Sequence, residues 1–148
     1  MLLEHLKIAD APYREAIAHA LAKIHQKDPR PLISLALTAE EKPVLLGLLR
    51  ALELLGSSDA IPVFQRAIQN PDAEVRRAVI TALASREETR AQQVLLEALR
   101  DPDPRLRIDA ARTLWAVDPH TVLQALARDP APEVQEAVRR LLQESARG

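Results

Sequence analysis

The sequence predicts an all-α fold, a right-handed α-solenoid (α-α superhelix) built from stacked helix pairs. Three observations support this prediction: one leucine returns at a fixed interval, each copy carries two apolar stripes of helical period, and Asp-Pro or Asn-Pro pairs separate the copies. A fixed interval of this length is typical of repeat folds, in which each copy is one layer and neighbouring layers bury a shared core. The interval is 31 residues, and the returning leucines are Leu21, Leu52, Leu83 and Leu114.

The first helix of each repeat is predicted from apolar residues at i, i+4 and i+8, as in Val75, Val79 and Leu83. Two further columns stay mostly apolar in the 31-residue register. They consist of Tyr13, Val44, Val75 and Leu106, and of Ile17, Leu48, Val79 and Ala110. A fifth copy follows after a shorter interval, with Val134, Val138 and Leu142.

The second helix of each repeat is predicted from another recurring stripe. Its members are Leu32, Ile33, Ala36 and Leu37, then Val63, Phe64, Ala67 and Ile68, then Val94, Leu95, Ala98 and Leu99, and finally Val122, Leu123, Leu126 and Ala127. Proline is tolerated only in a linker or a first helical turn, so each Asp-Pro or Asn-Pro pair indicates the end of a second helix. Asp72 and Asp103 are predicted to cap the helices that follow. The expected organisation is a single repeat domain, residues 1–148, with repeats at 11–40, 41–71, 72–102 and 103–130 and a final helix at 131–146.

Composition narrows the possible functions. The 148 residues carry 20 basic and 21 acidic side chains, so the basic excess that phosphate binding usually requires is missing and nucleic acid is not the expected partner. The absence of cysteine fits a reducing cytoplasm. Glu4, His5 and Lys7 interrupt the first apolar residues before a signal peptide can form. The longest apolar run, "PVLLGLL", is too short for a membrane span.

The stretch "DPDPRLRIDAARTL", residues 101–114, resembles the HEAT-like repeat, in the short form found in bacterial scaffold proteins and in phycobilin lyases. The resemblance covers residues 11–146. Val75-Arg76 and Leu106-Arg107 match the aliphatic-Arg pair of that family, and Tyr13-Arg14 matches it loosely. Val44-Leu45 and Val134-Gln135 depart from the pair, so a ladder of stacked Asp and Arg is expected to be interrupted there. The resemblance implies an α-solenoid that holds another macromolecule, and it implies no chemistry by itself.

No constellation of residues predicts catalysis, a cofactor or a metal. The four histidines, His5, His19, His25 and His120, do not form the repeated His-Glu pairs of a solenoid iron hydroxylase. No serine has a matching His and Asp, and the three glycines form no phosphate loop. The expected function is therefore a non-catalytic scaffold or adaptor for a protein partner. The alternatives are a phycobilin-lyase-like or lyase-accessory protein and, less favoured, a nucleic-acid-binding HEAT-like protein.

The second helices are expected to line the concave side and to offer a partner-binding strip. Its members are polar and mostly long, and they comprise Gln65, Arg66, Gln69, Gln93, Glu97, Arg100, Gln124 and Arg128. Amide and guanidinium donors of this kind suit a groove for an extended peptide or a helix. A solvated face without a partner explains the same pattern, and both interpretations stay open.

An apolar surface on the first helices is the second candidate interface, formed by Leu45, Leu46, Ile108 and Trp115. Exposed apolar residues of this kind suggest docking, including self-association with a second copy. The competing hypothesis is that the amino-terminal segment "MLLEHLKI" folds over Leu45 and Leu46 as a cap.

Asp109 stands in a column that is otherwise small. Burying an unpaired carboxylate is costly, so Asp109 is expected to pair with Arg76, Arg105 or Arg112.

Overall fold

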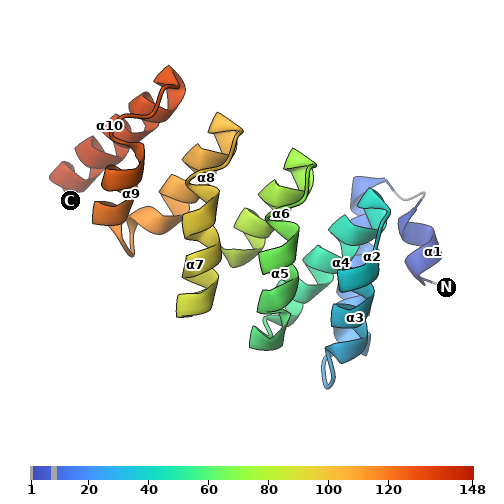
Figure 1. Cartoon of the computed structure of the whole chain (residues 1–148). Coiled ribbons are helices and arrows are strands. Elements are labelled where there is room, and N and C mark those ends of the chain that lie inside the picture. Colours follow the sequence, from blue (N-terminus) through green and yellow to red (C-terminus); the bar gives the residue numbers. More distant parts are fainter. Residues whose placement is uncertain (1, 8–9) are drawn as a thin grey trace. The chain divides into compact units, whose positions relative to one another are not determined.

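The computed structural model describes residues 2–7 and 10–148, and throughout this part of the chain the regular elements are helices (Figure 1). The chain divides into two compact units, residues 1–82 and residues 83–148. The predicted all-α fold of paired helices is therefore confirmed. A 31-residue interval would not by itself have distinguished helices from strands, so the helical period inside each copy is the informative signal.

The first unit holds α1 to α6 and a short 3-10 helix, η1. The bounds are α1 Leu2–Leu6, α2 Ala11–Ile24, α3 Arg30–Thr38, α4 Lys42–Leu55, η1 Ser58–Ala60, α5 Ile61–Ala67 and α6 Ala73–Leu83, whose last residue falls in the second unit. The first helices α2 and α4 pack against each other, and the second helix α3 packs against α4 and α5.

The second unit repeats this arrangement. Its helices are α7 Thr89–Ala98, α8 Pro104–Trp115, α9 Pro119–Leu126 and α10 Pro132–Arg147. The first helix α8 packs against α7, α9 and α10, and α9 also contacts α10. Helix α8 is thus held by the second helices before and after it and by the first helix of the next copy.

Side-chain caps begin several of these helices, as predicted. Asp72 Oδ1 accepts a hydrogen bond from the backbone N–H of Glu74 at 2.8 Å, and Asp103 Oδ1 accepts one from Arg105 at 2.9 Å. Each cap satisfies an amide that the first helical turn leaves without a partner, which is worth about 1 kcal/mol.

The core confirms the leucine column. Leu21, Leu52, Leu83 and Leu114 are all buried, with exposed fractions of 5%, 0%, 0% and 2%. Two apolar positions of the first and last copies differ, since Tyr13 is 48% exposed and Leu142 is 45% exposed. Leu142 lies on α10, which packs mainly against α8 and α9.

The aliphatic-Arg pairs tie the first helices α6 and α8 to the turns before them. Arg76 Nη1 donates to the carbonyl of Asn70 at 2.9 Å, and Arg107 Nη1 donates to that of Asp101 at 2.7 Å. Gln135 keeps this backbone contact, because its Nε2 donates to the Asp129 carbonyl at 2.7 Å. Leu45 is a buried apolar side chain and interrupts the series.

The amino-terminal segment packs on α4, which supports the hypothesis of a cap. Helix α1 contacts α2 and α4, and Leu6 is fully buried. Gly47 makes this approach possible, because a Cβ there would lie 2.5 Å from Leu6 Cδ2 and 2.8 Å from Cδ1. A glycine in the middle of a helix is therefore explained by close packing.

Candidate protein-binding surfaces

The second helices of the first unit carry a hollow that includes predicted partner-binding residues. This α3–α5 hollow has a volume of about 610 Å³, and Arg66 and Gln69 line it. Leu37 and Val63 supply apolar surface beside them. Long donor side chains therefore surround an apolar depression. Gln65, which is predicted for the same strip, is half-buried and lies outside the hollow.

The second unit has two adjoining hollows on α7 and α9, which we call together the α7–α9 hollows. Gln93, Glu97 and Arg100 line one of about 510 Å³. Arg100 also lines the other, of about 420 Å³, with Gln124 and Arg128. The structure thus brings the predicted residues of this unit together around shared depressions.

Of the four residues of the predicted apolar interface, one is buried in the structure and three are half-buried. Leu45 is only 8% exposed, so its assignment to an exposed surface is wrong; the side chain fills the core instead. Leu46 and Ile108 are half-buried. Trp115 is also half-buried, and its Nε1 donates a hydrogen bond to Ser145 Oγ of α10 at 2.6 Å. The indole is therefore engaged within its own unit.

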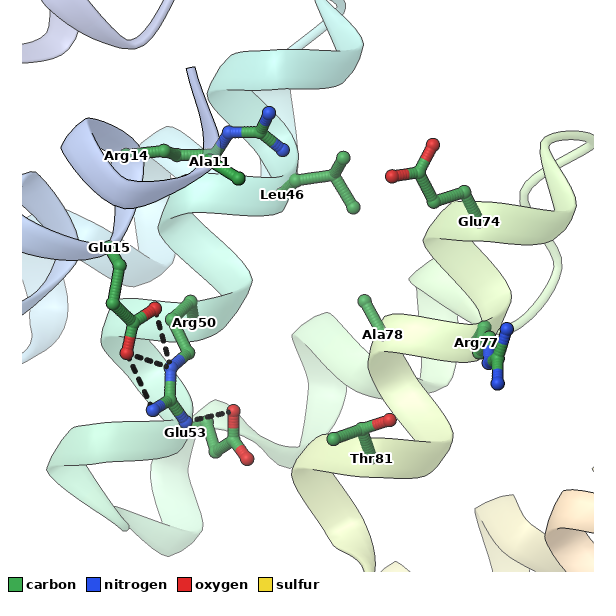
Figure 2. A pocket seen from close by; sticks show the side chains of 10 residues that line it. All are labelled: Ala11, Arg14, Glu15, Leu46, Arg50, Glu53, Glu74, Arg77, Ala78 and Thr81. Carbon is green, nitrogen blue, oxygen red and sulfur yellow. Dashed lines mark hydrogen bonds and ion pairs between the residues drawn. The ribbon is translucent and has the colours of Figure 1, made fainter. Parts of the chain in front are cut away.

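A further groove crosses the first helices α2, α4 and α6 in the first unit, and the sequence did not predict it (Figure 2). This first-helix groove has a volume of about 360 Å³. Small or apolar residues from each helix form part of its lining, namely Ala11, Leu46 and Ala78. The remaining lining residues are polar or charged: Arg14, Glu15, Arg50, Glu53, Glu74, Arg77 and Thr81.

Arg50 organises the charges at one end of the groove. Its Nε and Nη2 donate to the carboxylate of Glu15 at 2.7 to 3.0 Å, and its Nη1 donates to Glu53 Oε2 at 2.8 Å (Figure 2). The hydrogen bonds from Arg50 hold the pKa of Glu15 below its usual value. Those to Glu15 and then Glu53 raise the pKa of Arg50. The guanidinium of Arg50 is therefore already paired with carboxylates of its own chain.

Two other charged lining residues also have partners. Lys42 Nζ forms ion pairs with two carboxylates, at 2.7 Å from Glu74 Oε2 and 2.9 Å from Asp72 Oδ2. The hydrogen bonds of Lys42 to these two carboxylates raise its pKa, and the bond to Glu74 has the larger effect. Arg77 likewise takes part in an interaction of its own.

Arg14 differs from its neighbours in the groove. Its side chain forms no hydrogen bond or ion pair with any residue in the described ranges, and its Nε is buried without an acceptor. An unsatisfied buried donor costs roughly 1–3 kcal/mol, so this position calls for an explanation.

The repeat register explains why Arg14 lacks a partner. The equivalent Arg107 forms a bidentate ion pair with Asp129, in the turn that follows the second helix of the same repeat. In the earlier copies the position of Asp129 is occupied by Asp101, then Asn70, then Ala39. Arg14 is an arginine of the ladder whose acidic partner has been replaced by alanine, and this mismatch was readable in the sequence.

Two of the four histidines each contact one neighbouring polar side chain. His19 Nε2 lies 3.1 Å from Glu15 Oε1, and His5 Nδ1 lies 3.2 Å from the Tyr13 hydroxyl. Within residues 2–7 and 10–148 there is no group of three or more His, Cys, Asp or Glu side chains placed to hold a metal ion. None of the helices described combines the length and apolar character that crossing a membrane requires. Asp109 is half-buried and engaged in an interaction.

Comparison with known proteins identifies the family. A family model described as HEAT repeats matches residues 29–115, more than half of the chain, and the chain therefore belongs to the HEAT-repeat family. A crystal structure of an engineered protein is similar with a TM-score of 0.51 and 22% identity, over 95% of this chain and 76% of that chain. At this identity the likeness shows the fold alone. No curated protein matches the sequence.

Proposed function

We propose that this protein is a non-catalytic scaffold or adaptor, which binds a protein partner through the α3–α5 hollow and the α7–α9 hollows. HEAT repeats generally serve as scaffolds for protein–protein interaction. The observation that carries the proposal is that Arg66, Arg100 and Arg128 each line a hollow beside apolar side chains.

The chemistry of these hollows suits a peptide segment. Arginine donates to carboxylate and carbonyl groups in a fixed fork, and nearby Gln69 and Gln124 provide amide groups that both donate and accept. Leu96 and Leu99 offer apolar contact in the second unit. Because helices hold these side chains, little backbone order has to be gained on binding. The described residues that line the hollows include no aromatic ring, so they lend no support to bilin binding.

The test is a charge reversal on the second helices. A variant with Arg66→Glu, Arg100→Glu and Arg128→Glu is compared with the wild type in affinity capture from a lysate of the source organism, read by quantitative mass spectrometry. The proposal expects a defined set of proteins to be retained by the wild type and lost by the variant.

A matched control separates specific loss from a change in net charge. It carries Arg30→Glu, Arg112→Glu and Arg139→Glu, three exposed arginines outside the hollows, and it should retain the same proteins. Equal capture by all three forms would refute binding through these hollows.

A further inference from the structure

We propose that the first-helix groove is a second docking site, which takes an acidic-aliphatic segment of a protein partner. In this arrangement a Glu or Asp carboxylate of the partner pairs with Arg14, and an adjacent aliphatic side chain packs on Leu46. The site goes beyond the proposed function, since it lies on α2, α4 and α6 and shares no lining residue with the hollows of the second helices.

The charge balance of the groove selects this occupant. The guanidinium of Arg50 is saturated by Glu15 and Glu53, and Glu74 is neutralised by Lys42. Arg14 is left as the cation that forms no hydrogen bond or ion pair with described residues. It lies in the first turn of α2, where the positive end of the helix dipole favours an anion. The lining charges balance overall, and Arg14 is the guanidinium that is left to pair with a carboxylate of the partner.

The same balance disfavours phosphate groups. A doubly charged phosphate would need a second cation, but Arg50 and Lys42 are already paired with Glu15, Glu53 and Glu74. A side-chain carboxylate carries a single charge and matches the planar fork of Arg14.

The apolar part of the groove has room for a side chain of the partner. Ala11 on α2 and Ala78 on α6 are small, and the half-buried Leu46 of α4 lies between them in the view of Figure 2. A volume of about 360 Å³ is at the low end for ligand sites, which suits one or two side chains. The expected motif is an acidic residue next to Leu, Ile or Val.

A random-peptide display against the full chain tests the proposal directly. The wild type should enrich peptides with Asp or Glu beside an aliphatic residue. Arg14→Gln should lose the preference for an acidic residue. Ala78→Leu, which fills the apolar part of the groove, should lose the preference for an aliphatic residue. The control Arg112→Gln, an exposed position on α8, should enrich the same peptides as the wild type.

A double-mutant cycle then assigns the contact. The enriched peptide and its Glu→Gln (or Asp→Asn) form are titrated against wild type and Arg14→Gln by fluorescence anisotropy. Each single change should weaken binding about tenfold, and the combined change should weaken it little further, because both remove one charge-assisted hydrogen bond. Multiplied losses, or the absence of an acidic motif in the display, would overturn the proposal.

The two docking sites can fail independently. The variant with Arg66→Glu, Arg100→Glu and Arg128→Glu should bind the selected peptide as the wild type does. If it lost the peptide, the peptide would bind to the second helices, and the assignment to the first-helix groove would be wrong.

Discussion

Arg107 and Asp129 form a nearly buried bidentate ion pair between the first helix of the last full repeat and the turn that follows its second helix. Arg107 Nε lies 2.8 Å from Asp129 Oδ2, and Nη2 lies 3.0 Å from Oδ1. The side chains are only 13% and 6% exposed. Asp129 Oδ1 also accepts a hydrogen bond from the backbone N–H of Ala131 at 2.9 Å, just before α10 begins.

Asp129→Asn tests the contribution of this pair at nearly constant volume. The change leaves the guanidinium of Arg107 without a counter-charge, and we expect the free energy of unfolding at pH 7 to fall by about 2–3 kcal/mol. Urea denaturation followed by circular dichroism measures it. Asp28→Asn is the matched control, because the Asp28–Arg30 pair is exposed and should matter little. Equal effects of the two substitutions would contradict the structural role of the buried pair.

The same pair gives a prediction about pH. Burial acts to raise the pKa of Asp129, but the hydrogen bonds from Arg107 and from the backbone N–H of Ala131, together with the charge of Arg107, outweigh it and hold the pKa below its usual value. The ionised form therefore stabilises the folded state above the unfolded pKa of about 3.9, and this stabilisation is lost as the pH falls through the lower folded value. The stability gap between wild type and Asp129→Asn should be largest near pH 7 and should narrow below about pH 4. Urea titrations at pH 7, 5, 4 and 3 measure the gap, and one that widened in acid would show the sign to be wrong.

Gly47→Ala should loosen the packing of the amino-terminal helix without unfolding the chain. The new Cβ would collide with Leu6, while α4 would gain about 1 kcal/mol of helix propensity. Hydrogen exchange monitored by mass spectrometry should show faster exchange in α1 and unchanged protection in the middle of α4. Leu6→Ala is the control, since it should loosen α1 without the gain in propensity. Unchanged protection of α1 in Gly47→Ala would mean that the close contact has no role.

Gly56 tests the end of α4. Its φ of 68° lies in the left-handed region, and a Cβ there would meet nothing within 4 Å, so any cost of substitution arises from the backbone alone. Gly56→Ala should lower the free energy of unfolding by about 1 kcal/mol, as measured in urea, and Gly56→Asn should cost less. An alanine variant as stable as the wild type would rule out this backbone strain.

The sequence predicted the core better than the surfaces. The positions of Leu83 and Leu114 followed from periodicity, because burial in a repeat depends on register. The prediction for Leu45 was wrong because an apolar residue where neighbouring copies have arginine can be either an exposed patch or extra core, and the pattern does not distinguish them. The first-helix groove depends on how three helices are spaced, which the sequence does not encode locally. The one signal for it in the sequence is Ala39. This residue stands at the repeat position that holds Asp129, the partner of Arg107, so Arg14 has no acidic residue at the equivalent position.

The central claim is that the first four copies of the repeat bury the same leucine in the core, as Leu21, Leu52, Leu83 and Leu114. The most direct test is the free energy of unfolding in urea for Leu21→Ala, Leu52→Ala, Leu83→Ala and Leu114→Ala, with Leu142→Ala as the exposed control. The account predicts a loss of about 2–5 kcal/mol at each of the four buried positions and less than about 1 kcal/mol at the control. A buried position as tolerant as Leu142 would contradict it.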